Sequence, residues 1–291
     1  MARIISIVGA GRVGTTLGKR LRQLGWHVNA VVTRSQRTAR AAVRMIGGGT
    51  ARSRLTGDVL DADVVLLTTP DDALASAARS LAKIGGAWRG KVVLHTSGAL
   101  DRSVLDPLAR LGAATGSLHP MQTFSGRNVP KLDGVTFAVE GDGKALHVAK
   151  QIARSLGGVP VVIKSADKPA YHATAVLAAG SGFALIEAAA LILEGIGFTR
   201  RRAIETLLPL NRQMLDNIEQ HGPRAAWTGP LSRGDFEVVA KHLRAMRGYP
   251  REFQQSYATL AMLAARVLAK SPETTLRNLR RVLNKSQGGN R

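Results

Sequence analysis

The feature that most constrains this sequence is a glycine-rich hexapeptide near its start, Gly9-Ala10-Gly11-Arg12-Val13-Gly14. It directly follows Ile4–Val8, a continuous apolar run that is typical of a strand buried on both faces. Apolar residues at helical spacing come next, so the glycines lie at a turn from strand to helix. Such glycines allow a tight turn, bring the backbone close to a pyrophosphate, and let the helix pack closely on the strand. The sequence therefore predicts a dinucleotide-binding turn whose phosphates lie at the helix N-terminus.

The first half of the chain alternates apolar runs with helical repeats, as a parallel sheet with crossover helices requires. We expect strands at residues 4–8, 28–32, 45–46 (weakly), 64–68, 92–95, 116–119, 135–139 and 159–163. We expect helices between them at residues 13–24, 37–45, 73–84, 100–111 and 144–156. The fold predicted for residues 1–165 is α/β, a Rossmann-type doubly wound, mostly parallel sheet.

After residue 165 only helical patterns are found, at residues 170–195, 200–220, 235–247 and 252–269, with 284–291 as a frayed tail. We therefore predict an all-helical second domain in residues 166–291, serving substrate binding and dimerisation. The first of these helices is rich in small residues, which let another backbone approach closely. We expect it to be central to its domain.

The residues after the second predicted strand indicate which dinucleotide is bound. NAD sites place Asp or Glu there, about 20 residues after the glycines, to bind the ribose hydroxyls. This sequence has no acidic residue before Asp58, and Thr33, Arg34 and Ser35 stand at that position. A guanidinium group with neighbouring hydroxyls suits a 2′-phosphate. We therefore expect NADP(H) to be preferred over NAD(H).

Three further segments follow predicted strands, at residues 68–72, 95–98 and 119–124. Open parallel sheets bind ligands at the carboxyl ends of their strands, so these segments should lie along one crevice. We expect Thr69, Pro70 and Ser97 to flank the ribose and the nicotinamide. Two histidines, His95 and His119, end their strands and are either general acids or hydrogen-bonded structural groups.

The whole chain resembles the Rossmann-like family that carries domain of unknown function 2520. The resemblance rests on residues 9–14, 95–98 and 119–124, on Tyr171-His172 and on residues 228–235. That family is similar to pyrroline-5-carboxylate reductases and to the β-hydroxyacid and ketopantoate dehydrogenases. Its members are assigned as NADP-dependent oxidoreductases, and their helical domain commonly dimerises. The resemblance thus implies a reductase or dehydrogenase that acts as a homodimer.

One departure from the family pattern affects the expected mechanism. Gly180 occupies the position of an Asn that resembles the catalytic Asn of ketopantoate-type enzymes. Here Gly180-Ser181-Gly182 instead resembles the Gly-Ser-Gly turn of pyrroline-5-carboxylate reductases. An Asn-dependent β-hydroxyacid mechanism is therefore in doubt.

The candidate substrate site combines residues from both predicted domains. We predict catalytic roles for His119, His172 and Ser181, and substrate contacts for Gln122, Thr123, Gly180, Arg233 and Asp235. Simpler interpretations exist for several polar residues of the helical domain. Lys168 is expected to be a solvated side chain, Tyr171 fits a core aromatic residue, and Asp235 fits a helix N-cap.

The amino-acid composition narrows the possible functions, partners and locations of the protein. The net charge is +21, from 41 Lys and Arg against 20 Asp and Glu. A charge of this size makes nucleic-acid or polyanion binding a candidate function. Aromatic residues make up only 4%, so stacking platforms for single strands are scarce and nucleic acid is an unlikely partner. The chain has no Cys, its histidines and acids lack metal-ligand spacing, and no apolar run of membrane-spanning length stands out. We expect a soluble, cytoplasmic protein without a metal site.

The sequence therefore predicts an NADP-dependent oxidoreductase that transfers hydride between nicotinamide and a small C=O or C=N compound. The excess positive charge favours a substrate that bears a carboxylate. The alternatives are an NADPH-binding regulator without turnover, a polyanion binder, and a deazaflavin-linked reductase.

Overall fold

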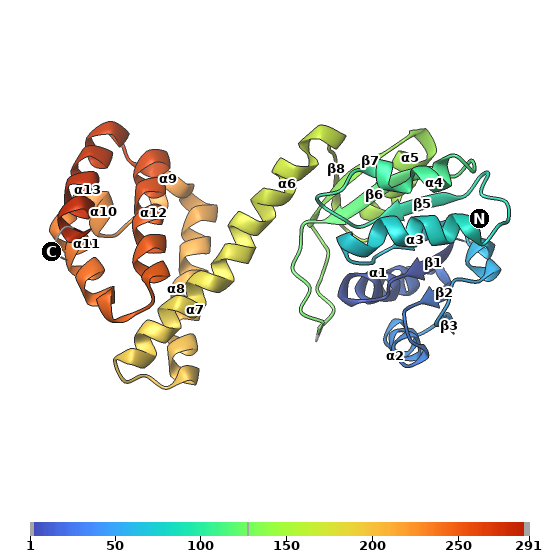
Figure 1. The fold of residues 1–291 in the computed structure, drawn as a ribbon, viewed down its shortest axis with the longest axis horizontal. Helices are drawn as coiled ribbons and strands as arrows, with labels where there is room; N and C mark the ends of the chain where they lie inside the picture. Colours follow the sequence, from blue (N-terminus) through green and yellow to red (C-terminus); the bar gives the residue numbers. More distant parts are fainter. Residues whose placement is uncertain (1–2, 127, 288–291) are drawn as a thin grey trace. The chain divides into compact units, whose positions relative to one another are not determined.

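The computed structural model describes residues 3–126 and 128–287. The chain divides into two compact units, Met1–Ala179 and Gly180–Arg291 (Figure 1). This division comes later in the chain than the predicted boundary at residue 165. The reason is that Lys168 and Tyr171 form hydrogen bonds with strand residues of the first unit.

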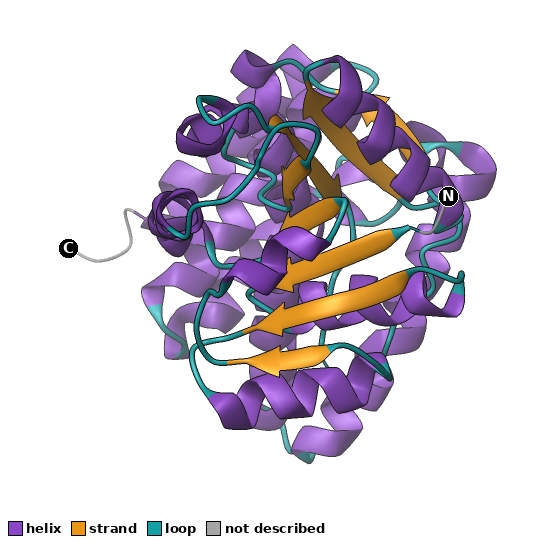
Figure 2. Ribbon diagram, turned by 90° about the vertical axis from the view of Figure 1, so that its right-hand side faces the viewer, coloured by secondary structure: helices purple, strands orange, loops and turns teal. Residues whose placement is uncertain are grey.

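The first unit contains one eight-stranded sheet with the strand order β3-β2-β1-β4-β5-β6-β7-β8 (Figure 2). The strands are β1 (Ile4–Val8), β2 (His27–Val32), β3 (Thr50–Arg52), β4 (Val64–Leu67), β5 (Val92–His95), β6 (Ala114–Pro120), β7 (Thr136–Gly141) and β8 (Val159–Val162). All neighbouring strands are parallel except β6 and β7, which pair antiparallel. The predicted mostly parallel, doubly wound sheet is confirmed.

Helices cover both faces of the sheet because alternate strand residues point to opposite sides. On one face, Ile5 and Ile7 of β1 share a core with α1 (Arg12–Gln23), α2 (Gln36–Ile46) and α5 (Gly143–Ser155). On the other face, Val65 and Leu67 of β4 share a core with α3 (Asp71–Lys83) and α4 (Asp106–Ala109). Short 3-10 turns at Gly57–Asp61, Arg102–Leu105 and Ser165–Asp167 join some of these elements.

Two predicted elements of the first unit are wrong. The weak strand at residues 45–46 is the last turn of α2, which continues to a buried Ile46 and ends at Gly47 with φ of +88°. The edge strand comes five residues later, at β3, where Thr50 pairs with Ala30 of β2. The helix expected over residues 100–111 is a 3-10 turn followed by one short turn of α-helix, α4.

The second unit is all-helical, as predicted. Helix α6 (Lys168–Ala175) lies in the first unit, and a π-helical turn at Val176–Gly180 leads into the second. Residues 170–195 therefore form three segments and not one regular helix. The unit contains α7 (Ser181–Gly195), α8 (Arg200–His221), α9 (Pro223–Ala226), α10 (Pro230–Arg233), α11 (Phe236–Ala245), a 3-10 turn (Met246–Gly248), α12 (Arg251–Leu268) and α13 (Pro272–Gln287). Its core joins α11 to α13 through Val239, Leu243, Leu276 and Leu279.

Helix α13 was not predicted. Residues 284–287, expected to belong to a frayed tail, form its last turn, and the rest of the expected tail lies outside the described residues. Its apolar Leu276 and Leu279 are three residues apart, which places both on the face packed against α11. That short apolar repeat lies among many charged residues, which is why the pattern is weak.

One helical run, Ser165–Gly195, is long and apolar enough to cross a membrane, with a mean hydropathy of 2.0 over its most apolar window. This corrects the expectation that no such run exists. Length and composition alone are weak support for a membrane span. Few residues of that window are buried within the chain, so its apolar side chains are available for a partner.

Candidate functional site

The glycine-rich turn lies between β1 and α1, where the sequence predicts it. Gly9 has φ of +89°, a conformation that favours glycine, and its N–H donates to the carbonyl of Val32 at 2.8 Å. The Thr68 hydroxyl at the end of β4 donates to the carbonyl of Gly9 at 2.7 Å and braces the turn from the neighbouring strand. A Cβ atom at Gly14 would overlap this hydroxyl and lie 3.2 Å from Ile7 of β1. Gly14 thus allows close packing of helix and strand.

The turn has the free groups that a dinucleotide requires. The N-cap residue of α1 is Gly11, which supplies no capping side chain, and the first turn of α1 holds no acidic residue. The N–H groups of that turn are therefore available for phosphate oxygens. A Cβ at Gly11 would meet no atom of the described residues closer than 4.0 Å, so these residues leave open the space in front of it. The Thr69 hydroxyl beside the turn is buried and has no hydrogen-bond partner within the described residues.

The other turn residues contribute backbone and shape. Ala10 and Val13 pack against the core beneath α1. The Arg12 side chain is exposed and lies against the backbone of Gly126. Pro70 is the residue before α3 and is exposed, so it can border a ligand without donating to one.

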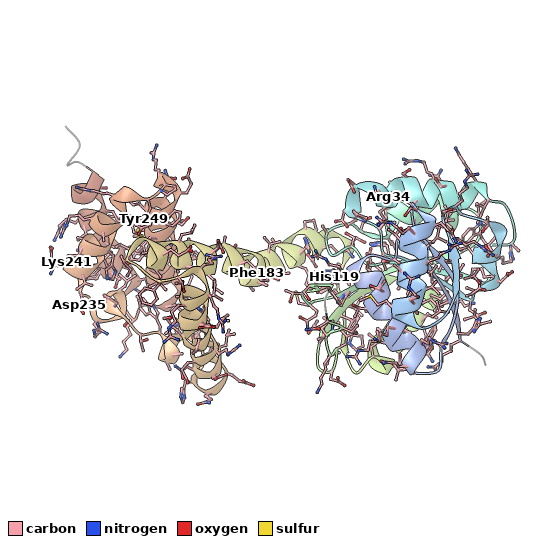
Figure 3. The ribbon with its side chains drawn as sticks, turned by 90° about the horizontal axis from the view of Figure 1, so that it is seen from below. Arg34, His119, Phe183, Asp235, Lys241 and Tyr249 are labelled. Carbon is pink, nitrogen blue, oxygen red and sulfur yellow. The ribbon has the colours of Figure 1, made fainter. Side chains whose placement is uncertain are left out.

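The segment after β2 presents Arg34 to solvent (Figure 3). Arg34 has no ion pair among the residues that the structure describes, and no Asp or Glu lies at the end of β2. The hydroxyls of Thr33 and Ser35 are both engaged with Thr38, because Ser35 is the N-cap of α2. The guanidinium group is therefore the free group of this segment, and the two hydroxyls hold the loop that carries it.

Three side chains converge at the carboxyl ends of β5 and β6. His119 of β6 places its Nδ1 atom 3.2 Å from the Tyr171 hydroxyl of α6, and its ring is edge-on to both Tyr171 and His172 at 5.6 Å. The Nδ1 atom of His172 is buried and has no partner in the described part of the chain. Burial first, then His172 and Lys168, lower the pKa of His119 to about 4. His119 is therefore a neutral imidazole at neutral pH.

Gly98 closes this histidine cluster, which we define as His119, Tyr171 and His172. A Cβ atom on Gly98 would lie 2.7 Å from Nε2 of His119 and 2.6 Å from Nδ1 of His172. Both nitrogen atoms thus face the same glycine, and no larger residue fits between them. The fold brings His119 and His172 together, as predicted, although 53 positions of sequence separate them.

His95, the other strand-end histidine, has a structural role. Its Nδ1 accepts from the Ser97 N–H at 3.2 Å, so Nε2 carries the proton and donates to the Asp101 carbonyl at 3.1 Å. The side chain is fully buried, and this burial is the main reason that its pKa falls to about 3. Both ring nitrogens are engaged, which leaves none for a ligand.

Ser97 holds the loop that carries Gly98. Its hydroxyl accepts from the N–H groups of Ala99 and Leu100 at 3.2 and 2.9 Å, and only 7% of the residue is exposed. The cofactor contact predicted for Ser97 stays a prediction.

Lys168 is buried, so the expectation of a solvated side chain is wrong. Its Nζ donates to the Ser117 hydroxyl at 2.7 Å and to the Ser97 carbonyl at 3.3 Å, and lies 3.6 Å from Oε2 of Glu140. Burial lowers the pKa of Lys168, and the Glu140 carboxylate opposes that shift. This network ties α6 to the loop that carries Gly98. It sets the position of Tyr171 and His172, which lie one turn further along the helix.

The remaining predicted site residues belong to several different elements. Gln122 and Thr123 are exposed after β6, where the Gln122 side-chain oxygen accepts from the Thr123 N–H at 2.8 Å. Gly180 and Ser181 lie at the π-turn and the start of α7, in the second unit. π-turns inside helices are frequent at functional sites.

Arg233 and Asp235 also belong to the second unit, on which Figure 3 labels Asp235. Asp235 is the N-cap residue of α11, as predicted, but its side chain caps nothing. Its Oδ2 instead accepts from Nε of Arg233 at 3.1 Å.

Comparison with known families agrees with this geometry. Residues 2–120 match the model of a Rossmann-like domain, and residues 135–264 match the model of domain of unknown function 2520. The chain therefore contains a Rossmann-like domain followed by a DUF2520 domain. None of the proteins with curated functions matches its sequence.

Solved structures share the fold of this DUF2520 protein. A protein from Bacteroides fragilis described as a candidate NADP oxidoreductase is 23% identical, with a TM-score of 0.76 over 89% of this chain and 96% of its own. A protein from Thermotoga maritima is 25% identical, with a TM-score of 0.67 over 95% and 99%. A reductive aminase from Aspergillus terreus, in complex with NADPH and ethyl-5-oxohexanoate, is 16% identical, with a TM-score of 0.68 over 95% and 99%.

For the DUF2520 protein's site, sequence reasoning gave no role to Glu140, interpreted Lys168 as solvated, and included Thr68 and Gly98 only as members of the segments 68–72 and 95–98. Thr68 is the last residue of one predicted strand and Gly98 follows the end of another, and this position is a usable signal for both. No local sequence pattern indicates that Lys168 and Glu140 are buried, because their burial depends on a pairing across 28 residues of sequence.

Proposed function

We propose that this protein is an NADP-dependent oxidoreductase that reduces a small C=O or C=N compound. The observation that carries the proposal is the combination of the open turn at Gly11 with a free guanidinium group on Arg34. The turn suits a pyrophosphate, and Arg34 suits the additional 2′-phosphate. The reductive aminase that shares this fold was solved with NADPH, which supports the choice of cofactor.

The histidine cluster suits the substrate side of this reaction. The nicotinamide, when bound, supplies the hydride. Because the pKa of His119 is about 4, its imidazole is neutral at neutral pH. It therefore acts through hydrogen bonds and not as a charged imidazolium acid. When Tyr171 donates to Nδ1, the Nε2–H of His119 is free to donate to a substrate oxygen or nitrogen.

Cofactor choice is tested by calorimetry with NADPH and NADH. We expect Arg34→Asp to weaken NADPH binding by about tenfold or more, because a charge-assisted bond is lost and a like charge is introduced. NADH binding should change much less. Arg44→Asp, at the exposed last turn of α2, is the matched control and should leave both affinities unchanged. Equal effects of Arg34→Asp on both cofactors would remove the NADP preference.

Turnover is tested with a panel of keto acids, cyclic imines and short-chain hydroxy acids. Variants with alanine at both His119 and His172 should bind NADPH normally and lose turnover. If the wild type binds NADPH but reduces no compound of the panel, the regulator without turnover becomes the better interpretation. The catalytic role predicted for Ser181 stays a prediction, as do the substrate contacts predicted for Gln122, Thr123, Gly180, Arg233 and Asp235.

We further propose that the protein forms a homodimer through its helical unit. Large apolar side chains of α7 and α8 are exposed, among them Phe183 at 68% and Leu210 at 67%. Soluble proteins seldom leave such surfaces uncovered. A second copy fits better than a lipid bilayer, because α7 carries Glu187, paired with Arg200, and a carboxylate at mid-helix is costly in lipid.

Leu210→Asp should convert a dimer to a monomer in sedimentation experiments. A protein that instead floats with lipid vesicles would contradict both the dimer proposal and the expected cytoplasmic location.

A further inference from the structure

We propose that a cavity within the helical unit binds a small anion that carries a planar group. The cavity has a volume of about 450 Å³ and lies among α9, α10, the end of α12 and the start of α13. All of its lining residues belong to the second unit. The proposal therefore goes beyond the cofactor and the histidine cluster, which belong to the first unit.

The charge of the lining points to an anion. Among the described residues, three basic ones line the cavity, Arg224, Arg233 and Lys270, and no acidic one does. The Asp235 carboxylate offsets one of these charges by pairing with Arg233. Arg224 and Lys270 have no ion pair among residues 3–126 and 128–287. Two cations thus border one small cavity without a counter-charge, and an anion that bridges them gains from both.

Polar side chains without partners border the same cavity. Within the described chain, the side chains of Ser271, Thr274 and Asn278 make no hydrogen bond and can donate to an anion. Ser232 differs, because its hydroxyl donates to the Gly229 carbonyl at 2.8 Å. Positive charges and free hydrogen-bond donors therefore line the same cavity.

The aromatic residues of the lining indicate the second part of the ligand. Trp227 and Phe236, both partly buried, border the cavity. A planar ring gains from contact with aromatic faces. A carboxylate or a phosphoryl group on an aromatic ring fits both halves of the site, since each is an anion that accepts from guanidinium and ammonium groups.

The test uses phenyl phosphate and phenylacetate as probes, with benzyl alcohol as the uncharged comparison. Trp227 reports on the cavity, because Trp26 and Trp88 are buried in the first unit at 4% and 1% exposure. Fluorescence titrations of the full chain are run at constant ionic strength, with NADP+ present to occupy any phosphate site at the glycine-rich turn. We expect a saturable change with at least one anion, and Trp227→Phe should abolish it.

The matched variants separate this cavity from the general positive charge of the protein. Arg224→Gln with Lys270→Gln should weaken binding of the anion by about tenfold or more, because two charge-assisted contacts are lost. Arg266→Gln with Arg280→Gln removes the same charge from exposed positions on α12 and α13 outside the cavity and should change binding less than about twofold.

Three outcomes would overturn the proposal: no saturable change with either anion, equal loss in the two double variants, or equal binding of benzyl alcohol. A preference for phenyl phosphate or for phenylacetate would show whether the group bound is phosphoryl or carboxylate. Because Trp227 reports locally, the result does not depend on whether NADP+ binds to the first unit.

Discussion

The Nζ atom of Lys168 lies 3.6 Å from Oε2 of Glu140, and the two side chains are only 2% and 7% exposed. Removal of one partner from a buried ion pair leaves an uncompensated charge, which typically costs about 3–5 kcal/mol. We therefore expect Lys168→Met to lower the free energy of unfolding by about that amount. The double variant Lys168→Met with Glu140→Gln should lose clearly less free energy of unfolding than Lys168→Met alone. Urea unfolding of the wild type, both single variants and the double variant measures the coupling, and strictly additive losses would contradict it.

Lys168 also contributes to the low pKa of His119, after burial and His172. In the double variant Lys168→Met with Glu140→Gln, we expect the pKa of His119 to rise above about 4, since a positive charge has left its surroundings. It should stay below the ordinary histidine value of 6.5, because burial remains. NMR titration of the imidazole protons measures this, with exposed His147 as the internal control. An unchanged His119 pKa would mean that Lys168 only positions the loop.

The two low histidine pKa values, about 3 for His95 and about 4 for His119, make stability depend on pH. In the unfolded chain both residues take up protons near pH 6.5, whereas in the folded chain they remain neutral until much lower pH. Unfolding therefore binds protons between about pH 4 and 6.5, and the free energy of unfolding falls as the pH falls through that window. Each histidine contributes at most about 1.4 kcal/mol per pH unit.

Denaturant unfolding between pH 5 and 7 measures this slope above the main carboxylate range. His119→Gln should reduce the slope, and His147→Gln, at an exposed position on α5, should not. Stability that stays constant over the window in the wild type would contradict the neutral state of both buried histidines.

Two glycines of the same turn should respond differently to alanine. Gly14→Ala places a Cβ against the Thr68 hydroxyl and near Ile7, so we expect lower stability with or without cofactor. Gly11→Ala meets no atom closer than 4.0 Å, so stability should be retained. The added methyl group stands where a pyrophosphate would approach, and NADPH affinity should therefore fall. Thermal unfolding and calorimetry on both variants test this, and Gly11→Ala with normal NADPH binding would argue against the cofactor site.

The sequence was most informative where a local pattern has a single physical solution. The glycine-rich turn, the parallel strands and the ends of most helices follow from apolar periodicity and from residues that favour turns. It also placed His119 and His172 in one candidate site, and their ring centroids lie 5.6 Å apart in the structure. In contrast, the strand at residues 45–46 was misplaced, since Ile46 serves equally well as the last buried residue of a helix.

The polar interior could not be predicted in the same way. A lysine at the start of a helix is usually solvated, and only the fold brings Glu140 and Ser117 around Lys168. Similarly, His95 and His119 both lie near the carboxyl ends of the neighbouring strands β5 and β6. Their roles differ because Ser97 and Asp101 occupy both nitrogens of His95, whereas Tyr171 occupies one nitrogen of His119.

The histidine cluster depends on the absence of a side chain at Gly98. With alanine there, the new methyl group would lie 2.7 Å from Nε2 of His119 and 2.6 Å from Nδ1 of His172, so the rings must move apart. Gly98→Ala should therefore reduce turnover strongly while NADPH affinity, set at the glycine-rich turn and Arg34, stays near that of the wild type. Gly90→Ala is a comparison in the loop before β5, where a Cβ meets nothing within 4 Å; since its φ is +84°, it should cost stability and not turnover. Steady-state kinetics and calorimetry on both variants separate the two effects. A Gly98→Ala enzyme with full activity would show that the two histidines do not need their present arrangement for the reaction.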